Sequence, residues 1–290
     1  MPPGVGADKR RLGPPESPVR RAVVPAFWSR ILVAVVGLPV VIGAVWLGGW
    51  WLFALAAVGG AIALHEFFSI TRPLRPLVPA GYVGAGLALV GAQLGGPGWA
   101  LGGLMAALPL ALLLKGIGDT RASTTAAIGT TVLGAAWIGI GLACTLLVRD
   151  IPEHALLAVL AVMLAVFAGD TAAYFTGRLV GRHKLWPALS PAKTWEGFVA
   201  GAIATVAVTF FALYQDRDDF IPIWQALVLG VVVALAAPAG DLFESAIKRD
   251  MQVKDTGRLL AGHGGVLDRI DSLLFAFVAS YYLLRGFGAA

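Results

Sequence analysis

Residues 154–175 read HALLAVLAVMLAVFAGDTAAYF, an apolar run with one carboxylate, Asp170, near its end. A helix needs about 20 such residues to cross the hydrocarbon core of a bilayer. Comparable runs recur through the 290 residues, of which 58% are hydrophobic and only 13% are charged. An ordinary soluble domain is about 45–50% apolar and about 25% charged. The composition therefore excludes a soluble enzyme, a disulfide scaffold and a collagen-like chain, and it predicts an all-α, polytopic transmembrane helical bundle.

About nine membrane-spanning helices are expected along the chain. Glycines predict two tight turns between neighbouring spans, at Gly48-Gly49 and at residues 95–98. Gly197 and Gly201 are four residues apart, a spacing that lets two helices approach closely. The expected spans are residues 31–47, 50–69, 78–95, 99–114, 126–148, 154–175, 197–214, 223–247 and 270–287.

The basic residues predict the orientation of these spans. With the N-terminus in the cytoplasm, all of the 22 Lys and Arg residues except Arg149, Arg217 and Arg285 fall on the cytoplasmic side. This asymmetry follows the positive-inside rule, and one miscounted span would destroy it. We therefore expect a multi-pass protein of a bacterial-type inner (plasma) membrane, with its active face toward the cytoplasm.

Three regions are expected along the chain. Residues 1–29 are rich in proline and basic residues and predict a disordered basic arm. Residues 30–160 form the N-terminal transmembrane helices. Residues 161–290 form the C-terminal transmembrane region, which is expected to be catalytic because most of the remaining polar residues lie there.

Several charged residues lie near the ends of expected spans. An ionised carboxylate at the middle of a bilayer costs about 2.5–3.5 kcal/mol on insertion scales, so such residues are expected to face a wet cavity, a cation or a basic partner. Asp241, Glu244, Ser245 and Lys248 follow the spacing i, i+3, i+4 and i+7, which puts them on one face of one helix. Asp170 lies near the end of another span.

A second group of polar residues begins the last span. Asp268 and Asp271 follow the glycine-rich stretch Gly262-His263-Gly264-Gly265, where the backbone can approach a ligand closely. Carboxylates from two helices, next to basic residues, suit a hard cation that bridges to phosphate oxygens.

The connection before residue 197 adds a basic element. Ser190 and Pro191 predict the N-cap and first residue of a helix, with Lys193 in its first turn. A helix N-terminus with a lysine is a ready site for an anion. His65-Glu66, near the end of the second span, is read equally well as a lining pair or as an ordinary helix-end pair.

The residues alone therefore predict a Mg²⁺-dependent membrane enzyme that acts on phosphates in a cavity open to the cytoplasm. Beyond this chemistry, two segments carry a resemblance to a known family. One is Ser245-Ala-Ile-Lys248-Arg249, continued by Lys254-Asp255-Thr-Gly257 and by residues 262–271, GHGGVLDRID. The other runs from Asp170 through Tyr174 to residues 190–197, SPAKTWEG. Together they resemble the phosphatidate cytidylyltransferases (CDP-diacylglycerol synthases), with Ala261 standing where that family usually has Pro or Gly.

The resemblance implies a reaction and a set of catalytic residues. CTP and phosphatidic acid are the expected substrates, CDP-diacylglycerol and pyrophosphate the products, and Mg²⁺ the cofactor, with a second cation as a further expectation. The implied metal ligands are Asp241 and Asp268, with Asp170 as a further candidate. The residues implied to hold phosphates are Lys248, Arg249 and Lys193.

The resemblance also implies substrate-binding residues. Hydrogen-bond donors to phosphate or pyrophosphate would be Ser190, Ser245 and His263, and phosphate would lie against the backbone of Gly264 and Gly265. Arg269 would pair with Asp268 or contact the lipid head group. Asp170, Tyr174 and Lys254 complete the set. The other expected partners are the lipid bilayer and a second copy of the chain in a homodimer, and no nucleic acid is expected.

Two other functions stay open at this point. A CTP-dependent kinase of a polyprenol or phytol-type alcohol would transfer the γ-phosphoryl group instead of the cytidylyl group. An ion-coupled membrane transporter would also have carboxylates within the bilayer. The polar residues cluster at one face of the predicted bundle, which favours the transferase.

Overall fold

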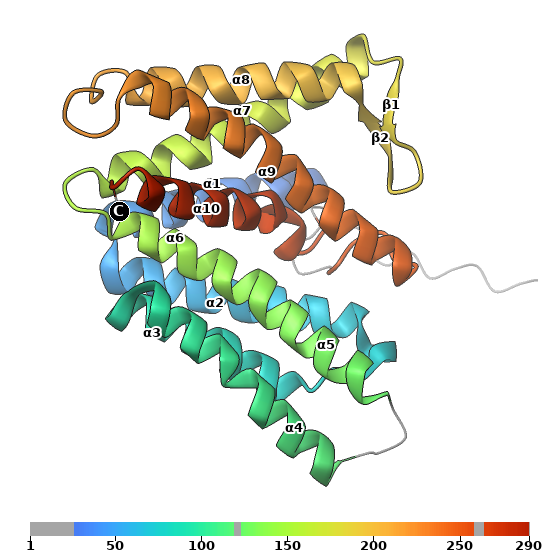
Figure 1. The fold of residues 1–290 in the computed structure, drawn as a ribbon. Helices are drawn as coiled ribbons and strands as arrows, with labels where there is room; N and C mark the ends of the chain where they lie inside the picture. The colour runs from blue at the N-terminus through green and yellow to red at the C-terminus, as the bar shows by residue number, and fades with distance from the viewer. Residues whose placement is uncertain (1–25, 119–122, 258–263, 290) are drawn as a thin grey trace, which may run out of the picture.

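The computed structural model describes residues 26–118, 123–257 and 264–289, which are almost entirely helical (Figure 1). The short elements are a 3-10 turn η1 (Arg72–Leu74), a π-helical turn η2 (Ala135–Ile140) and the strands β1 (Lys184–Trp186) and β2 (Ser190–Thr194). The α-helices are α1 (Ala26–Leu47), α2 (Gly49–Ile70), α3 (Val78–Met105), α4 (Ala107–Ile117), α5 (Thr124–Gly134), α6 (Gly141–Arg149), α7 (Ala155–Leu179), α8 (Trp195–Leu213), α9 (Ile223–Asp250) and α10 (Leu267–Gly286).

The two predicted glycine turns are confirmed. Gly48 and Gly49, between α1 and α2, have φ angles of 64° and 48°, which favour glycine. Within α3, Gly96 has a φ of 76° and precedes Pro97, so the helix reverses there. A methyl group on Gly91 would overlap the backbone carbonyl of Trp99, because the two arms of α3 pack closely side by side.

Six stretches of the described residues are long and apolar enough to cross a membrane. This confirms an all-α, multi-pass membrane protein, although fewer stretches meet that criterion than the nine spans predicted. Residues 78–117 count as one stretch despite the reversal at Gly96. The part of α1 whose side chains are described is short, and α10 carries four charged residues, Asp268, Arg269, Asp271 and Arg285.

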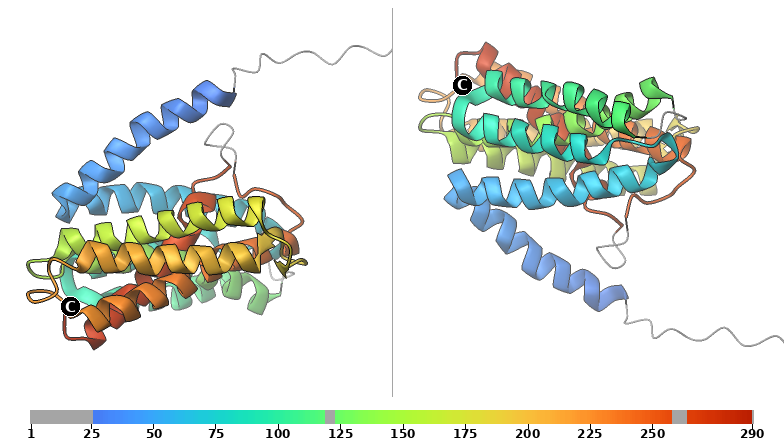
Figure 2. Two further views of the ribbon diagram at one scale, coloured as in Figure 1. Left: turned by 90° about the horizontal axis from the view of Figure 1, so that it is seen from above. Right: turned by 90° about the horizontal axis from the view of Figure 1, so that it is seen from below.

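The helices form two groups with α10 between them. In Figure 1, α7, α8 and α9 lie together on one side, and α2 to α6 lie on the other. Helix α10 packs against α9 and also against α6, where Gly141 lies directly on the side chain of Leu274. The side chains of Leu274 and Phe277 are buried in this core. Helix α1 leaves the other helices at an angle (Figure 2).

Helices α7 and α8 pack with their backbones in close contact. A methyl group on Gly197 would overlap the carbonyl oxygen of Ala173, and one on Gly201 would overlap that of Gly169. The predicted role of Gly197 and Gly201 is therefore confirmed. The contact between Gly169 of α7 and Gly201 of α8 places Asp170, the next residue of α7, beside α8.

The prediction that a helix begins at Ser190 is wrong. Ser190 to Thr194 form β2, which pairs antiparallel with β1 in the register Lys184 to Thr194 and Trp186 to Ser190. Pro191 is tolerated because a two-stranded hairpin has only edge strands. Helix α8 begins at Trp195, and its N-cap is Thr194, whose hydroxyl accepts a hydrogen bond from Gly197 N at 3.2 Å.

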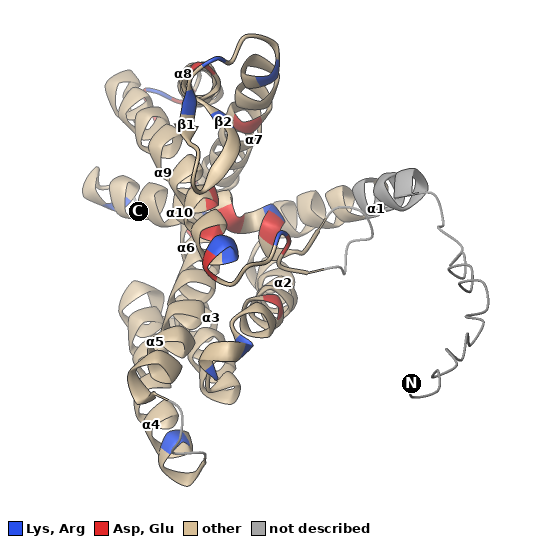
Figure 3. Ribbon diagram, turned by 90° about the vertical axis from the view of Figure 1, so that its right-hand side faces the viewer, with Lys and Arg blue, Asp and Glu red and all other residues tan. Residues whose placement is uncertain are grey.

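One end of the bundle gathers the polar elements. The β1–β2 hairpin, the C-terminal end of α9, the start of α10 and the C-terminal end of α2 all lie there, and Figure 3 marks charged residues along the ribbon of these elements. The opposite end has the loops after α6 and α8 and the C-terminal end of α10 (Figure 1).

Candidate active site

A cavity of about 840 Å³ opens among α7, the β1–β2 hairpin, α8, α9 and α10. One part of its wall is apolar and includes Val166, Phe167, Phe198 and Leu273. The other part is strongly charged. Its acidic and basic residues are Asp170, Arg178, Lys184, Lys193, Asp241, Glu244, Lys248, Asp268, Arg269 and Asp271.

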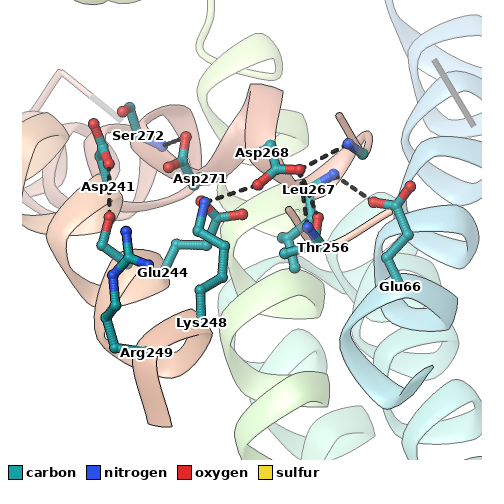
Figure 4. A network of polar contacts seen from close by, with 12 residues as sticks. Glu66, Asp241, Glu244, Lys248, Arg249, Thr256, Leu267, Asp268, Asp271 and Ser272 are labelled. Carbon is teal, nitrogen blue, oxygen red and sulfur yellow. Dashed lines mark hydrogen bonds and ion pairs between the residues drawn. The ribbon is translucent and has the colours of Figure 1, made fainter. Parts of the chain in front are cut away.

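Lys248 connects two helices at the charged part of the cavity (Figure 4). Its Nζ lies 2.6 Å from Glu244 Oε2, one turn earlier on α9, and 2.8 Å from Asp268 Oδ1 on α10. The side chain of Glu244 is 2% exposed and that of Lys248 is 15% exposed. Separating the partners of such shielded ion pairs is costly, because each charge would be left buried and uncompensated. The two pairs therefore hold α9 and α10 in a fixed arrangement at this point.

Asp268 is held by the loop before it as well as by Lys248. Its Oδ2 accepts hydrogen bonds from Gly265 N at 2.7 Å, from Thr256 N at 3.1 Å and from the Thr256 hydroxyl at 3.0 Å. Gly264 has a φ of 82°, a backbone conformation that glycine adopts readily. The glycine-rich stretch therefore shapes a turn around the Asp268 carboxylate.

A second ion pair joins the hairpin to α9. Lys193 Nζ on β2 lies 2.8 Å from Asp241 Oδ2. Asp241 Oδ1 accepts a long hydrogen bond of 3.4 Å from the Ser245 hydroxyl. Asp170, on α7, lines the same part of the cavity. The structure thus brings together residues from three helices and one strand that lie up to about a hundred positions apart in the sequence.

Seven of the predicted site residues line this cavity. They come from α7, β2, α9 and the first turn of α10. They are Asp170, Tyr174, Lys193, Asp241, Lys248, Asp268 and Arg269.

The other predicted residues within the described ranges lie outside the lining. Arg249 is exposed, and its Nε donates to the carbonyl of Leu189 at 3.2 Å, so it ties the hairpin to α9. Lys254 is exposed on the loop after α9. Ser190 in β2, Ser245 in α9, and Gly264 and Gly265 in the turn before α10 are not among the lining residues. His263 and Ala261 lie outside the described residues.

Three acidic residues of this region were noted in the sequence but were not assigned as metal ligands or substrate contacts. Glu244 and Asp271 line the cavity, and their helical spacing from Lys248 and Asp268 was the available signal. Glu66 is 5% exposed, and its carboxylate accepts hydrogen bonds from Val266 N and Leu267 N. Glu66 lies near the C-terminal end of α2 and outside the cavity lining, and its carboxylate caps a helix about 200 positions away.

The interior of the cavity is rich in carboxylates. Its lining includes five acidic residues, Asp170, Asp241, Glu244, Asp268 and Asp271, together with five basic residues. Glu244 Oε1 is buried and has no hydrogen-bond partner among the described residues. The described residues contain no group of three or more His, Cys, Asp or Glu arranged to enclose a metal ion by themselves. Such a site suits a cation whose remaining ligands are phosphate oxygens and water, which is how Mg²⁺ is usually bound.

Comparisons with known proteins agree on one family. A family model described as the cytidylyltransferase family matches residues 28–287. A phosphatidate cytidylyltransferase of Staphylococcus haemolyticus is 33% identical over 250 residues, which cover 85% of this chain and 94% of the relative. One from Staphylococcus aureus is 34% identical over 251 residues, with the same coverage. One from Bacillus subtilis is 38% identical over 161 residues, which cover 55% of this chain and 59% of the relative.

These matches extend the resemblance to the N-terminal helices, which carry none of the motifs quoted above. They also bear on the alternatives. The relatives carry the name of a cytidylyltransferase, so the lipid kinase and the ion-coupled transporter are not favoured.

Proposed function

Because the chain belongs to the cytidylyltransferase family, we propose that it transfers the cytidylyl group of CTP to phosphatidic acid. The observation that carries the proposal is the cavity itself, where a charged wall and an apolar wall meet inside a membrane protein. A substrate with a phosphate head and acyl chains needs both surfaces. The products are CDP-diacylglycerol and pyrophosphate.

The reaction is a substitution at the α-phosphorus of CTP. An oxygen of the lipid phosphate forms a new bond to that phosphorus, and the bond to the bridging oxygen of pyrophosphate breaks. Phosphatidic acid is already anionic, so no strong base is needed. The main barrier is to bring two polyanions together in one orientation, and enzymes lower such barriers by positioning and by electrostatic stabilisation.

Two of the lysines that line the cavity supply part of that stabilisation. Lys193 comes from β2 and Lys248 from α9, and their ion pairs with Asp241 and Asp268 fix their orientation. Preorganised charges of this kind need no rearrangement when the transition state forms. Arg269, Tyr174 and Asp170 also line the cavity and are the proposed contacts to substrate.

Three predicted residues outside the cavity lining are proposed to act by holding lining residues in place. Ser245 orients Asp241, and Gly265 orients Asp268 through its backbone N–H. Arg249 holds the hairpin that carries Lys193. Direct contacts of Ser190, Lys254 and Gly264 with phosphate stay predictions.

Mg²⁺ is the proposed cofactor, with Asp241 and Asp268 as its protein ligands. The five carboxylates gathered in the lining and the buried, unpartnered Glu244 Oε1 support a bound cation. When bound, the ion would neutralise charge on the phosphates of CTP. A second cation and a homodimer stay predictions.

We also propose nine spans with the N-terminus in the cytoplasm of a bacterial cell, so that the cavity opens toward the cytoplasm. The reversal of α3 at Gly96 supports counting residues 78–95 and 99–114 as two spans. The distribution of Lys and Arg supports the orientation. The residues that line the cavity all fall between Val166 and Leu273, which supports a catalytic region at 161–290.

Product analysis tests this function. The purified protein in detergent is incubated with phosphatidic acid, Mg²⁺ and CTP labelled at the α-phosphate, beside an Asp268→Asn variant. The label is expected in a lipid product, and it should disappear when Mg²⁺ is chelated or Asp268 is replaced. Label transferred only from γ-labelled CTP to an added alcohol would support the lipid kinase. If neither label reaches any lipid, the proposal is wrong.

A further inference from the structure

Glu66 is a buried carboxylate in the half of the chain that does not line the cavity. Its side chain is 5% exposed, and its helical neighbours Phe67 and Leu64 are almost completely buried. A carboxylate in such surroundings is costly unless hydrogen bonds compensate its charge. Figure 4 shows it reaching from α2 toward the first residues of α10.

The compensation comes from the start of α10. Glu66 Oε1 accepts a hydrogen bond from Val266 N at 3.0 Å, and Oε2 accepts one from Leu267 N at 2.8 Å. The first N–H groups of a helix have no acceptor within the helix. Val266 has no side chain that can cap α10, and Leu267 is fully buried. Glu66 therefore serves as the N-cap of α10 from another helix, and its negative charge is favourable at a helix N-terminus.

The capped turn is the one that holds Asp268. Asp268 follows Leu267 directly and bonds to Lys248 with one oxygen and to Gly265 and Thr256 with the other. The turn is thus held from two sides, by Glu66 from α2 and by the Asp268 carboxylate from within. Neither Glu66 nor Thr256 lines the cavity.

The loop is also shaped around the Glu66 carboxylate. A methyl group on Gly257 would overlap Glu66 Oε1, and a methyl group on Gly265 would overlap Oε2. Two glycines from separate parts of the loop therefore leave room for the same carboxylate. This close fit is independent of the hydrogen bonds and indicates that the position of the turn depends on Glu66.

We infer that Glu66 is a positioning residue for cytidylyl transfer. It fixes the first turn of α10 so that Asp268 and Lys248 face the reacting phosphates. The inference rests on the proposed function, because the orientation of Asp268 and Lys248 matters to that reaction. It also assigns a task to α2, which brings a residue of the N-terminal half to the active site without contact to substrate.

The first test is Glu66→Gln, with His65→Ala as the matched control. Glutamine has the same shape, but its amide offers one acceptor oxygen and turns a donor toward the other backbone N–H. We expect kcat to fall by about tenfold or more, since small displacements of reacting groups cost that much. The KM for CTP should stay within about twofold, because Glu66 does not touch the cavity. His65 is exposed on the same helix, and its replacement should leave both constants unchanged.

The second test uses Gly257→Ala, which pushes a methyl group against Glu66 while leaving the carboxylate in place. Alone it should lower kcat as Glu66→Gln does. In a Glu66→Ala background the methyl group has room, so Gly257→Ala should cause no further loss. This non-additivity is specific to contact between the two residues. If Glu66→Gln folds poorly, Gly257→Ala alone, which keeps the carboxylate, still tests the role.

Three results separate the possibilities. If the wild-type protein makes no CDP-diacylglycerol, the proposed function fails before Glu66 is considered. If the wild type is active and Glu66→Gln keeps its kcat, the positioning role is wrong. The role is also wrong if Gly257→Ala lowers kcat by the same factor with and without the Glu66 carboxylate, because the loss then comes from elsewhere in the loop.

Discussion

The ammonium group of Lys248 lies between carboxylates of two helices, 2.6 Å from Glu244 and 2.8 Å from Asp268. Helical spacing explains the first contact, because residues four apart share a face. The second contact requires α10 to begin next to the end of α9. Lys193, Lys248 and their carboxylate partners are thus paired before substrate arrives, which keeps their geometry.

A substitution at Lys193 can remove one charge from the cavity while it keeps most of the packing of the side chain. Lys193→Met keeps the length of the side chain and removes the ammonium group that faces Asp241 at 2.8 Å. We expect kcat/KM for CTP to fall by about 100-fold, as when one preorganised donor is removed from an active site. Steady-state rates with labelled CTP measure this. Arg72→Met, an exposed cation of η1, should change the rate by less than about twofold. Equal losses in both variants would contradict a specific role for Lys193.

At the scale of elements, the β1–β2 hairpin is the part of the cavity wall that is not helical, and it carries Lys193. It ends at Thr194, which belongs to β2 and also caps α8. Arg249 fastens its turn to α9 through the carbonyl of Leu189. The hairpin is therefore held at both ends, and Lys193 lies between these two attachments.

The cap of α8 gives a prediction for stability. Thr194→Ala removes the hydroxyl that accepts from Gly197 N and should destabilise the protein by about 1 kcal/mol, a typical value for an N-cap. Thr194→Ser keeps the hydroxyl and should lose much less. Thermal unfolding in detergent measures both. Ser69→Ala is the control, because the Ser69 hydroxyl is exposed and bonds only to its own helix. A Thr194→Ala protein as stable as that control would show that the cap is unimportant.

At the scale of the whole molecule, the charged residues that line the cavity come from the end of the bundle that faces the viewer in Figure 3. A bilayer around the helices leaves that end in contact with one aqueous phase. The apolar lining residues Val166, Phe198 and Leu273 lie farther along their helices from that end, which suits the acyl chains of a lipid. Water-soluble CTP and a lipid can therefore meet at one site.

The proposed orientation can be measured in whole bacterial cells. In a Cys144→Ala background, which removes the one native cysteine, single cysteines replace Arg182 at the hairpin end and Asp218 at the opposite end. A thiol reagent that cannot cross the inner membrane should label the position 218 variant in intact cells and the position 182 variant only after the cells are lysed. The reverse pattern would mean that the cavity faces away from the cytoplasm.

The sequence alone was enough for the properties that depend on neighbouring residues. The length of each apolar run predicts a helix, and the observed helices match the predicted spans within a few residues at most ends. The glycine turns were predicted for the same reason, since a positive φ at Gly48 or Gly96 is a local requirement. Seven predicted residues also line the cavity. Six of them are charged, and Tyr174 was named from the family resemblance.

Only the tertiary structure decided the contacts between helices that are distant in the chain. The region around Ser190 looked like a helix start, yet pairing with β1 and the cap at Thr194 make it a strand. Glu66 could not be assigned, because the N–H groups that it binds are about 200 residues away. Local sequence sets where a helix forms and how long it is. Which buried charge meets which partner depends on how the formed helices pack, and that information is spread over the whole chain.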